Sequence, residues 1–264
     1  MFVDSHCHLS SPELIDSVPE IRAAMAEASV DRALCICTTL DEFPRVHALA
    51  TEYDNFWCSA GVHPDEEDSR EPTVDGLVGL AALAKVVAIG ETGLDYFRLA
   101  GRTLADMEWQ RERFRVHIRA ARASGLPLVI HTREASADTL RLLREEEGSA
   151  AGGVFHCFTE TAEVARAALD LGFYISFSGI LTFKKAEDLR AVAAFVPLDR
   201  CLIETDSPYL APTPFRGKVN TPANVPWVAR QLAEIKALNV EDIAEVTSAN
   251  FERLFSRTVP RTST

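Results

Sequence analysis

Eight short runs of apolar and β-branched residues recur along this 264-residue chain, with helical patterns between them. Most of the runs are continuously apolar rather than alternating, which is typical of parallel strands covered on both faces. They predict strands over residues 2–9, 32–39, 56–62, 86–90, 127–132, 153–158, 174–181 and 201–205. A repeat of this kind restricts the chain to the α/β class.

The segments between the runs have the spacing of apolar residues that is typical of helices. They predict helices over residues 12–29, 41–53, 74–83, 106–124, 135–147, 161–171, 185–195, 222–238 and 240–255. Eight strand–helix units favour a (β/α)8 TIM barrel over a doubly wound open sheet. No linker or shift in composition is visible, so we expect one domain over residues 1–264, with the last few residues disordered.

Charge and hydropathy exclude some classes of protein. The net charge of −12 argues against a protein that coats nucleic acid by charge alone. It leaves room for an enzyme that holds nucleic acid locally, because bound metal ions can invert the charge of a small site. No run of 18 apolar residues and no secretory signal is visible, so we expect a cytoplasmic monomer without a membrane span or protein partner.

Five of the seven histidines fall at the carboxyl ends of predicted strands, and only His47 and His117 lie in helical segments. In a barrel these strand ends open onto one face, where catalytic residues gather. Histidines with a few carboxylates form the ligand set of zinc, manganese and similar ions. The strand-end residues are His6, His8, His63, Glu91, His131, His156, Glu204 and Asp206.

The pair His6 and His8 stands two residues apart in the first predicted strand. Residues i and i+2 of a strand point to the same side, so both imidazoles can bind one ion while Cys7 faces the core. Two hydrogen-bonded histidines without a metal are the alternative. The other strand-end histidines, with Glu91 and Asp206, weigh against that alternative.

Motifs along the chain resemble those of one family. They are DSHCHL, GVHP, IGETGLDY, PLVIHTREA, HCF, YISFSGILTFKK, IETDSPYL and SANFERLF, in this order from residue 2 to about residue 255. The set resembles the TatD family of metal-dependent DNases, a branch of the amidohydrolase-like barrels. The resemblance implies a barrel with two, sometimes three, divalent metal ions.

The resemblance also implies a role for each strand-end residue. The metal ligands would be His6, His8, Glu91, His131, His156 and Asp206. Glu91 would bridge the ions, and Asp206 would also handle the nucleophilic water. His63 would contact the substrate phosphate. Many members have a second histidine in a GVHPH motif, and this chain has Asp65 there.

Other residues are predicted from their position near the strand ends. Arg133, Lys185 and Arg216 could bind phosphates, or they could be solvated charges and salt-bridge partners. A base could stack on Tyr96, although most aromatic residues in loops simply pack. Two acids are candidates for the surroundings of the metals. Asp95 could hydrogen-bond a ligand histidine, and Glu204, on the same side as Asp206 but deeper, could be a ligand or support one.

The predicted chemistry is hydrolysis. Two ions can clamp a phosphodiester and lower the pKa of a bound water toward about 7. We therefore expect a metal-dependent deoxyribonuclease with Asp206, Glu91 and His63 as catalytic residues. The family implies a 3′→5′ exonuclease on single-stranded DNA. Mg, Mn or Zn could serve, and histidine ligands favour Zn or Mn over Mg.

Two alternatives remain. The same metal-activated water could attack an amide or ester, as in an aminoacyl-tRNA deacylase. The basic loops around Lys185 and Arg216 discriminate weakly in favour of phosphate. A scaffold without catalytic activity would be expected to lack at least one ligand, and this chain has them all.

Overall fold

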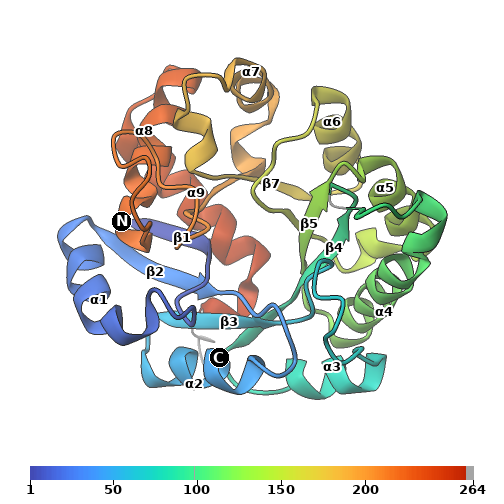
Figure 1. The fold of residues 1–264 in the computed structure, drawn as a ribbon. Coiled ribbons are helices and arrows are strands. Elements are labelled where there is room, and N and C mark those ends of the chain that lie inside the picture. Colours follow the sequence, from blue (N-terminus) through green and yellow to red (C-terminus); the bar gives the residue numbers. More distant parts are fainter. Residues whose placement is uncertain (98, 260–264) are drawn as a thin grey trace, which may run out of the picture.

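Eight parallel strands, hydrogen-bonded in chain order from β1 to β8, form one nearly closed barrel (Figure 1). The computed structural model describes residues 1–97 and 99–259. The expected disorder of the last residues concerns 260–264, which lie outside this range. The strands are β1 Phe2–Cys7, β2 Val30–Cys35, β3 Phe56–Ala60, β4 Val86–Asp95, β5 Leu128–Arg133, β6 Gly153–Phe155, β7 Tyr174–Phe177 and β8 Cys201–Ile203. The predicted (β/α)8 barrel is confirmed.

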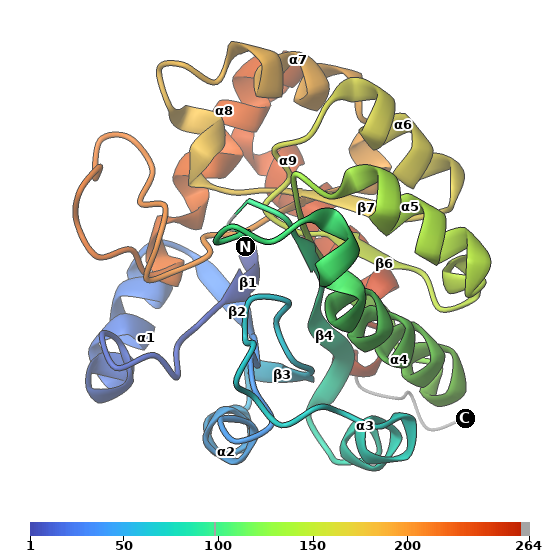
Figure 2. The same cartoon turned by 45° about the vertical axis from the view of Figure 1, so that its right-hand side comes forward.

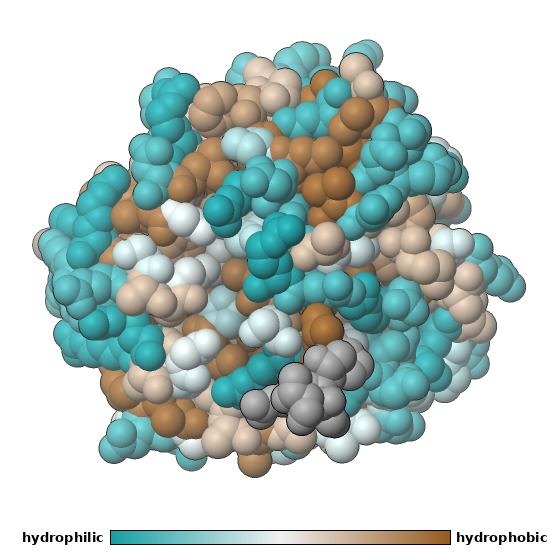
Figure 3. Space-filling model, turned by 180° about the vertical axis from the view of Figure 1, so that it is seen from behind, coloured by the Kyte–Doolittle hydropathy of each residue, from teal (hydrophilic) through white to brown (hydrophobic). Residues whose placement is uncertain are grey.

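Helices surround the barrel and cover its outer face (Figure 2). They are α1 Val18–Glu27, α2 Phe43–Glu52, α3 Val74–Ala81, α4 Glu108–Ser124, α5 Ser136–Glu145, α6 Ala162–Asp170, α7 Glu187–Phe195, α8 Val225–Lys236 and α9 Val240–Leu254. Among the described residues, every helix is too short or too polar to cross a membrane. Seen from behind, hydrophilic residues alternate with small groups of hydrophobic ones (Figure 3).

Two apolar clusters hold the barrel together. The larger one fills the space between strands and helices. The smaller one includes Val3, Leu34, Val129 and Leu202 from four strands, together with Phe251 of α9. Tyr174 of β7 belongs to this cluster too, and polar side chains such as Ser5 of β1 and Ser176 of β7 stand further along these strands and bond to each other. Because this cluster supplies the apolar packing inside the barrel, the carboxyl ends of the strands can carry polar side chains.

The fourth strand is longer than predicted. It continues through Gly90 and Gly93 to Asp95, so Glu91 lies within the strand rather than after it. The register of the hydrogen-bonded pairing between β4 and β5 shifts between Ile89 and Thr92. A Cβ atom added at Gly93 would lie only 1.9 Å from the carbonyl oxygen of His131. Glycine here permits close approach of two strands, whereas the sequence pattern predicted that the strand ends at residue 90.

The first helix is shorter than predicted, because it begins at Val18 instead of residue 12. Pro19 explains the difference. A proline ring fits the first turn of a helix but disrupts its interior. The residues before the helix, including Ser11 and Pro12, instead line the pocket at the mouth of the barrel.

The seam between β8 and β1 has few backbone hydrogen bonds, and the carboxyl group of Asp4 helps to close it. The backbone N–H of Asp206 donates to His6 O at 2.9 Å, and that of His8 donates to Ser207 O at 2.7 Å. Asp4 Oδ1 accepts the N–H of Thr205 at 2.9 Å and that of His6 at 3.3 Å. Burial raises the pKa of Asp4 to about 8.

Removal of this carboxyl group tests the seam. Asp4→Ala leaves two backbone N–H groups buried without partners, so we expect the free energy of unfolding to fall by about 3 kcal/mol. Asp4→Asn keeps an acceptor oxygen and a donor, and it should cost about 1 kcal/mol or less. Urea unfolding of the EDTA-treated proteins measures both. Equal losses for the two variants would contradict this role of Asp4.

Candidate metal centre

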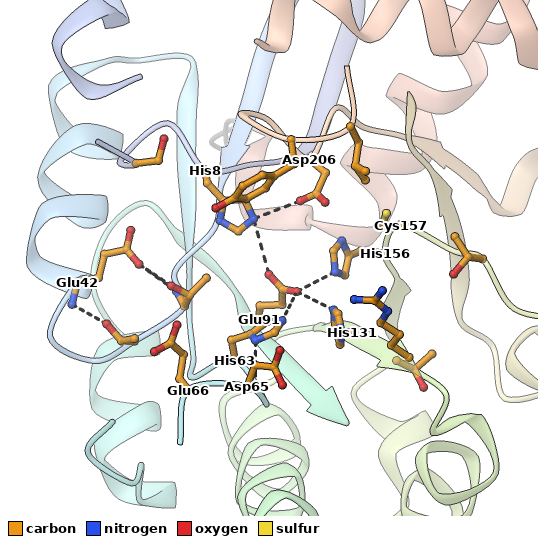
Figure 4. Close-up of a pocket in the computed structure, with 18 of the residues that line it drawn as sticks. His8, Glu42, His63, Asp65, Glu66, Glu91, His131, His156, Cys157 and Asp206 are labelled. Atoms are coloured by element: carbon orange, nitrogen blue, oxygen red, sulfur yellow. Dashed lines mark hydrogen bonds and ion pairs between the residues drawn. The ribbon is translucent and has the colours of Figure 1, made fainter. Parts of the chain in front are cut away.

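A pocket of about 880 Å³ opens at the carboxyl ends of the strands. Seven of the predicted site residues line it, and they come from elements far apart in the sequence (Figure 4). They are His8, His63, Glu91, His131, Arg133, His156 and Asp206. His6 lies directly beneath this surface and is fully buried. The convergence predicted from the strand ends is therefore present.

The carboxylate of Glu91 is the centre of this arrangement and is almost completely buried. Its Oε2 faces His6 Nε2 at 3.3 Å, and Asp206 Oδ1 lies 3.2 Å from His8 Nε2. The two histidine Nε2 atoms are 3.2 Å apart, and His6 Nε2 lies 3.5 Å from Asp206 Oδ1. Four ligands placed tetrahedrally about 2.0–2.1 Å from one ion stand about 3.3–3.4 Å apart. This first cluster has the spacing of a metal site.

The other carboxylate oxygen of Glu91 faces a second cluster. Oε1 lies 2.8 Å from His156 Nε2, 3.3 Å from His131 Nδ1 and 3.4 Å from His63 Nε2. One buried carboxylate thus presents one oxygen to each cluster. This is the arrangement expected of a carboxylate that bridges two ions.

Hydrogen bonds fix the tautomers of two histidines in the second cluster. His131 Nε2 lies 2.9 Å from the Asp95 carboxylate, so the proton belongs on Nε2 and Nδ1 is free to bind a metal. His156 Nδ1 lies 3.3 Å from Glu204, so its Nε2 is free. The predicted contact between Asp95 and a histidine is present, and Glu204 supports a histidine while its Oε1 also accepts the N–H of Cys157.

His63 has the opposite arrangement. The backbone N–H of Asp65 donates to His63 Nδ1 at 3.1 Å. The proton of a neutral imidazole must then lie on Nε2, the atom that faces Glu91 and the pocket. A protonated nitrogen is a hydrogen-bond donor and not a metal ligand. His63 is therefore suited to donate to a substrate oxygen rather than to bind a metal.

The electrostatics of the site are compatible with bound cations. Burial raises the pKa of the Glu91 carboxyl, but the surrounding imidazoles outweigh burial and hold this pKa well below its usual range. Among the described residues, His156 Nε2 is buried and has no hydrogen-bond partner, although it lies 2.8 Å from the Glu91 carboxylate. A nitrogen this close to a carboxylate needs positive charge, which a proton on the imidazole or a bound metal ion supplies. Burial lowers the pKa of His156, but the two neighbouring carboxylates outweigh burial and raise this pKa well above its usual range. The donor set therefore fits metal ions.

The predicted substrate-binding residues separate into two groups. Arg133 lines the pocket, and its guanidinium lies 3.5 Å from the ring centre of Phe97. Lys185 and Arg216 are not among the described residues that line it. Tyr96 is 5% exposed and its hydroxyl donates to Asp138 at 2.8 Å, so its ring packs and offers no face to a base. Stacking on Tyr96 is not supported by this position.

Sequence reasoning missed two kinds of supporting residue. Asp4 closes the seam beside the first cluster, and its signal was an acidic residue within an apolar strand. His117 and Arg113 of α4 contact the segment that carries His63. A histidine within a helical pattern gave no sign of this contact.

Comparison with known proteins gives a consistent result. The sequence profile of the family described as "TatD related DNase" matches residues 3–256. The chain is 49% identical over 257 residues to the protein of Escherichia coli K12 named "Uncharacterized metal-dependent hydrolase YcfH", covering 96% of this chain and 95% of the relative. It is 33% identical over 262 residues to the "3'-5' ssDNA/RNA exonuclease TatD" of Citrobacter rodentium, covering 97% and 98%.

A solved structure agrees with the fold as well. The crystal structure of YJJV, a TatD homologue from Escherichia coli K12, superposes with a TM-score of 0.90. The match covers 98% of each chain at 29% sequence identity.

The contact between Asp95 and His131 generates a test of metal binding. Asp95→Asn removes the charge that orients the imidazole, so we expect affinity for Zn²⁺ to fall about 10- to 100-fold. Competition with a chromophoric chelator measures this affinity. Asp138→Asn is the matched control, because Asp138 bonds to Tyr96 outside the pocket. Equal affinities of both variants and the wild type would show that Asp95 does not support a ligand.

Proposed function

The chain belongs to the TatD family of metal-dependent hydrolases, and on that premise we propose that it is a deoxyribonuclease. The proposed reaction is hydrolysis of phosphodiester bonds, with 3′→5′ polarity on single-stranded DNA. The observation that carries it is Glu91, whose two oxygens face two adjoining ligand clusters. The polarity and the single-stranded substrate are supported by the relative named as a 3′-5′ ssDNA/RNA exonuclease.

In this proposal each cluster holds one ion and Glu91 belongs to both. The first ion would be held by His6, His8 and Asp206, and the second by His131 and His156. When bound, two divalent ions neutralise charge on a phosphodiester and lower the pKa of water. Every residue of the proposed site comes from one chain, so the proposal needs no second subunit.

Asp206 is the proposed proton acceptor. Burial raises the pKa of its carboxyl, but the hydrogen bond with His8 and the nearby imidazoles lower this pKa below its usual value. The carboxylate is therefore ionised at neutral pH. Its side chain is 15% exposed and lies at the pocket wall, where it can accept a proton from water.

His63 is the proposed donor to the phosphate. Its Nε2–H group lies at the pocket surface beside the second cluster. A donor there can bond to a non-bridging oxygen of the substrate, where negative charge develops in the transition state. This agrees with the phosphate contact implied by the family resemblance.

The wall of the pocket supports a narrow, single-stranded substrate. Arg133 lies on the pocket wall, where a guanidinium can hold a phosphate, and Tyr209, which is 58% exposed, lines the pocket beside His8. Asp65 and Glu66 also line the pocket and would repel a second backbone. The balance of charge favours a strand end over long duplex DNA.

A nuclease assay tests the function. Single-stranded DNA labelled at the 3′ or the 5′ end is incubated with EDTA-stripped protein that has been reloaded with Mg²⁺, Mn²⁺ or Zn²⁺. We expect stepwise, metal-dependent release of mononucleotides from the 3′ end. Asp206→Asn should lower kcat at least about 100-fold, because it removes the proton acceptor. Asp170→Asn, the same change at an exposed position of α6, is the control.

Equal activity of wild type and Asp206→Asn would contradict the proposed function. If wild type and Asp206→Asn release nucleotides at the same rate, the nuclease activity is not that of this site. The intact ligand set would then favour hydrolysis of an ester or amide, and acyl substrates would be assayed next.

Substrate contacts can be ranked in the same assay. Arg133→Gln removes a charged donor from the pocket wall, so we expect KM for single-stranded DNA to rise about fivefold to tenfold. Lys185→Gln should change KM less, because Lys185 is not among the described residues that line the pocket. A larger effect at Lys185 would show that the substrate follows a different path.

A further inference from the structure

Helix α4 carries a buried arginine and a buried histidine one turn apart. The Arg113 side chain is 1% exposed, and His117 is completely buried. Burial of such groups is costly unless all their polar atoms find partners. Each side chain directs one nitrogen toward the segment after β3, which carries His63.

The contacts hold the backbone on both sides of His63. His117 Nε2 accepts the N–H of Val62 at 3.0 Å, and its Nδ1 donates to Arg113 O at 2.8 Å. Arg113 Nη1 donates to the carbonyl oxygen of His63 at 3.0 Å. The rest of the guanidinium pairs with Glu71, whose side chain is largely exposed.

Burial keeps His117 in the state that these contacts require. It lowers the pKa of His117 to about 4, so the imidazole is neutral near pH 7. A neutral imidazole has one donor and one acceptor, and both are used here. A protonated His117 could not accept the N–H of Val62.

Other contacts leave the His63 ring little freedom. The backbone N–H of His63 donates to Thr38 O at 2.8 Å, and Asp65 fixes the ring tautomer. The direction of the Nε2–H group therefore depends on where the backbone of residues 62–63 lies. Helix α4 sets that position from behind the barrel wall.

We propose that Arg113 and His117 are positioning residues that hold His63 with its Nε2–H directed at the substrate phosphate. The proposal rests on the proposed function of His63, and it adds two residues of α4 on which the orientation of His63 depends. A residue that only stabilises the fold would lower kcat equally with and without the His63 side chain. A residue that positions His63 would lower kcat only when that side chain is present.

A double-mutant cycle tests this dependence. The four proteins are wild type, His63→Ala, His117→Leu and the double variant, each assayed with the p-nitrophenyl ester of thymidine 5′-monophosphate at matched metal content. We expect His117→Leu to lower kcat about tenfold in wild type. In the His63→Ala background it should change kcat less than about twofold. Equal losses in both backgrounds would overturn the proposal.

A second measurement does not require activity. In the Zn²⁺-loaded protein, the ¹⁵N shifts of the His63 ring report its tautomer. We expect one Nε2–H species in wild type and in His117→Gln, whose amide can still accept from Val62, and altered shifts in His117→Leu. Unaltered shifts in His117→Leu would overturn the positioning role. If wild type does not cleave the ester, the cycle is repeated with single-stranded DNA; if that is not cleaved either, the proposed function fails and these shifts alone decide the positioning role.

Glu71→Gln provides a milder variant if His117→Leu does not fold. It weakens the partner of Arg113 from an exposed side chain, so the core is not disturbed. The same dependence on His63 is expected, with a smaller loss of kcat. Independence from His63 would again contradict the proposal.

Discussion

The buried carboxylate of Glu91 is the constraint on which the rest of the site depends. Five imidazoles and the Asp206 carboxylate surround it at the mouth of the barrel. Nitrogen lone pairs and carboxylate oxygens at these distances do not stabilise one another without positive charge. The arrangement is therefore understandable as a site preformed for metal ions, with one oxygen of Glu91 for each of two clusters.

Each histidine or pair of histidines at the site is oriented by a different supporting carboxyl group. Asp4 ties β1 to the segment after β8, so that His6 and His8 face Asp206. Glu204 and Asp95 select the free nitrogen of one histidine each. Such supporting contacts commonly determine how well a ligand binds its metal. A barrel provides them because each strand end has neighbours on both sides.

Much of this could be predicted from the sequence, since parallel strands share one face at their carboxyl ends and histidines at those ends must converge. Less predictable features depended on three-dimensional contacts. Glu91 lies inside β4 because Gly90 and Gly93 permit close packing, although the apolar pattern predicted a strand that ends at residue 90. The tautomer of His63 depends on a backbone N–H, and the exclusion of Lys185 from the pocket depends on the path of a loop.

The most direct test of the central claim is anomalous X-ray diffraction from crystals loaded with Mn²⁺ or Zn²⁺, recorded at the absorption edge of each metal. The account predicts two peaks, one beside each oxygen of Glu91. His6, His8 and Asp206 should contact one ion, His131 and His156 the other, and His63 neither. A single peak away from Glu91, or a metal bound by His63 Nε2, would contradict the account.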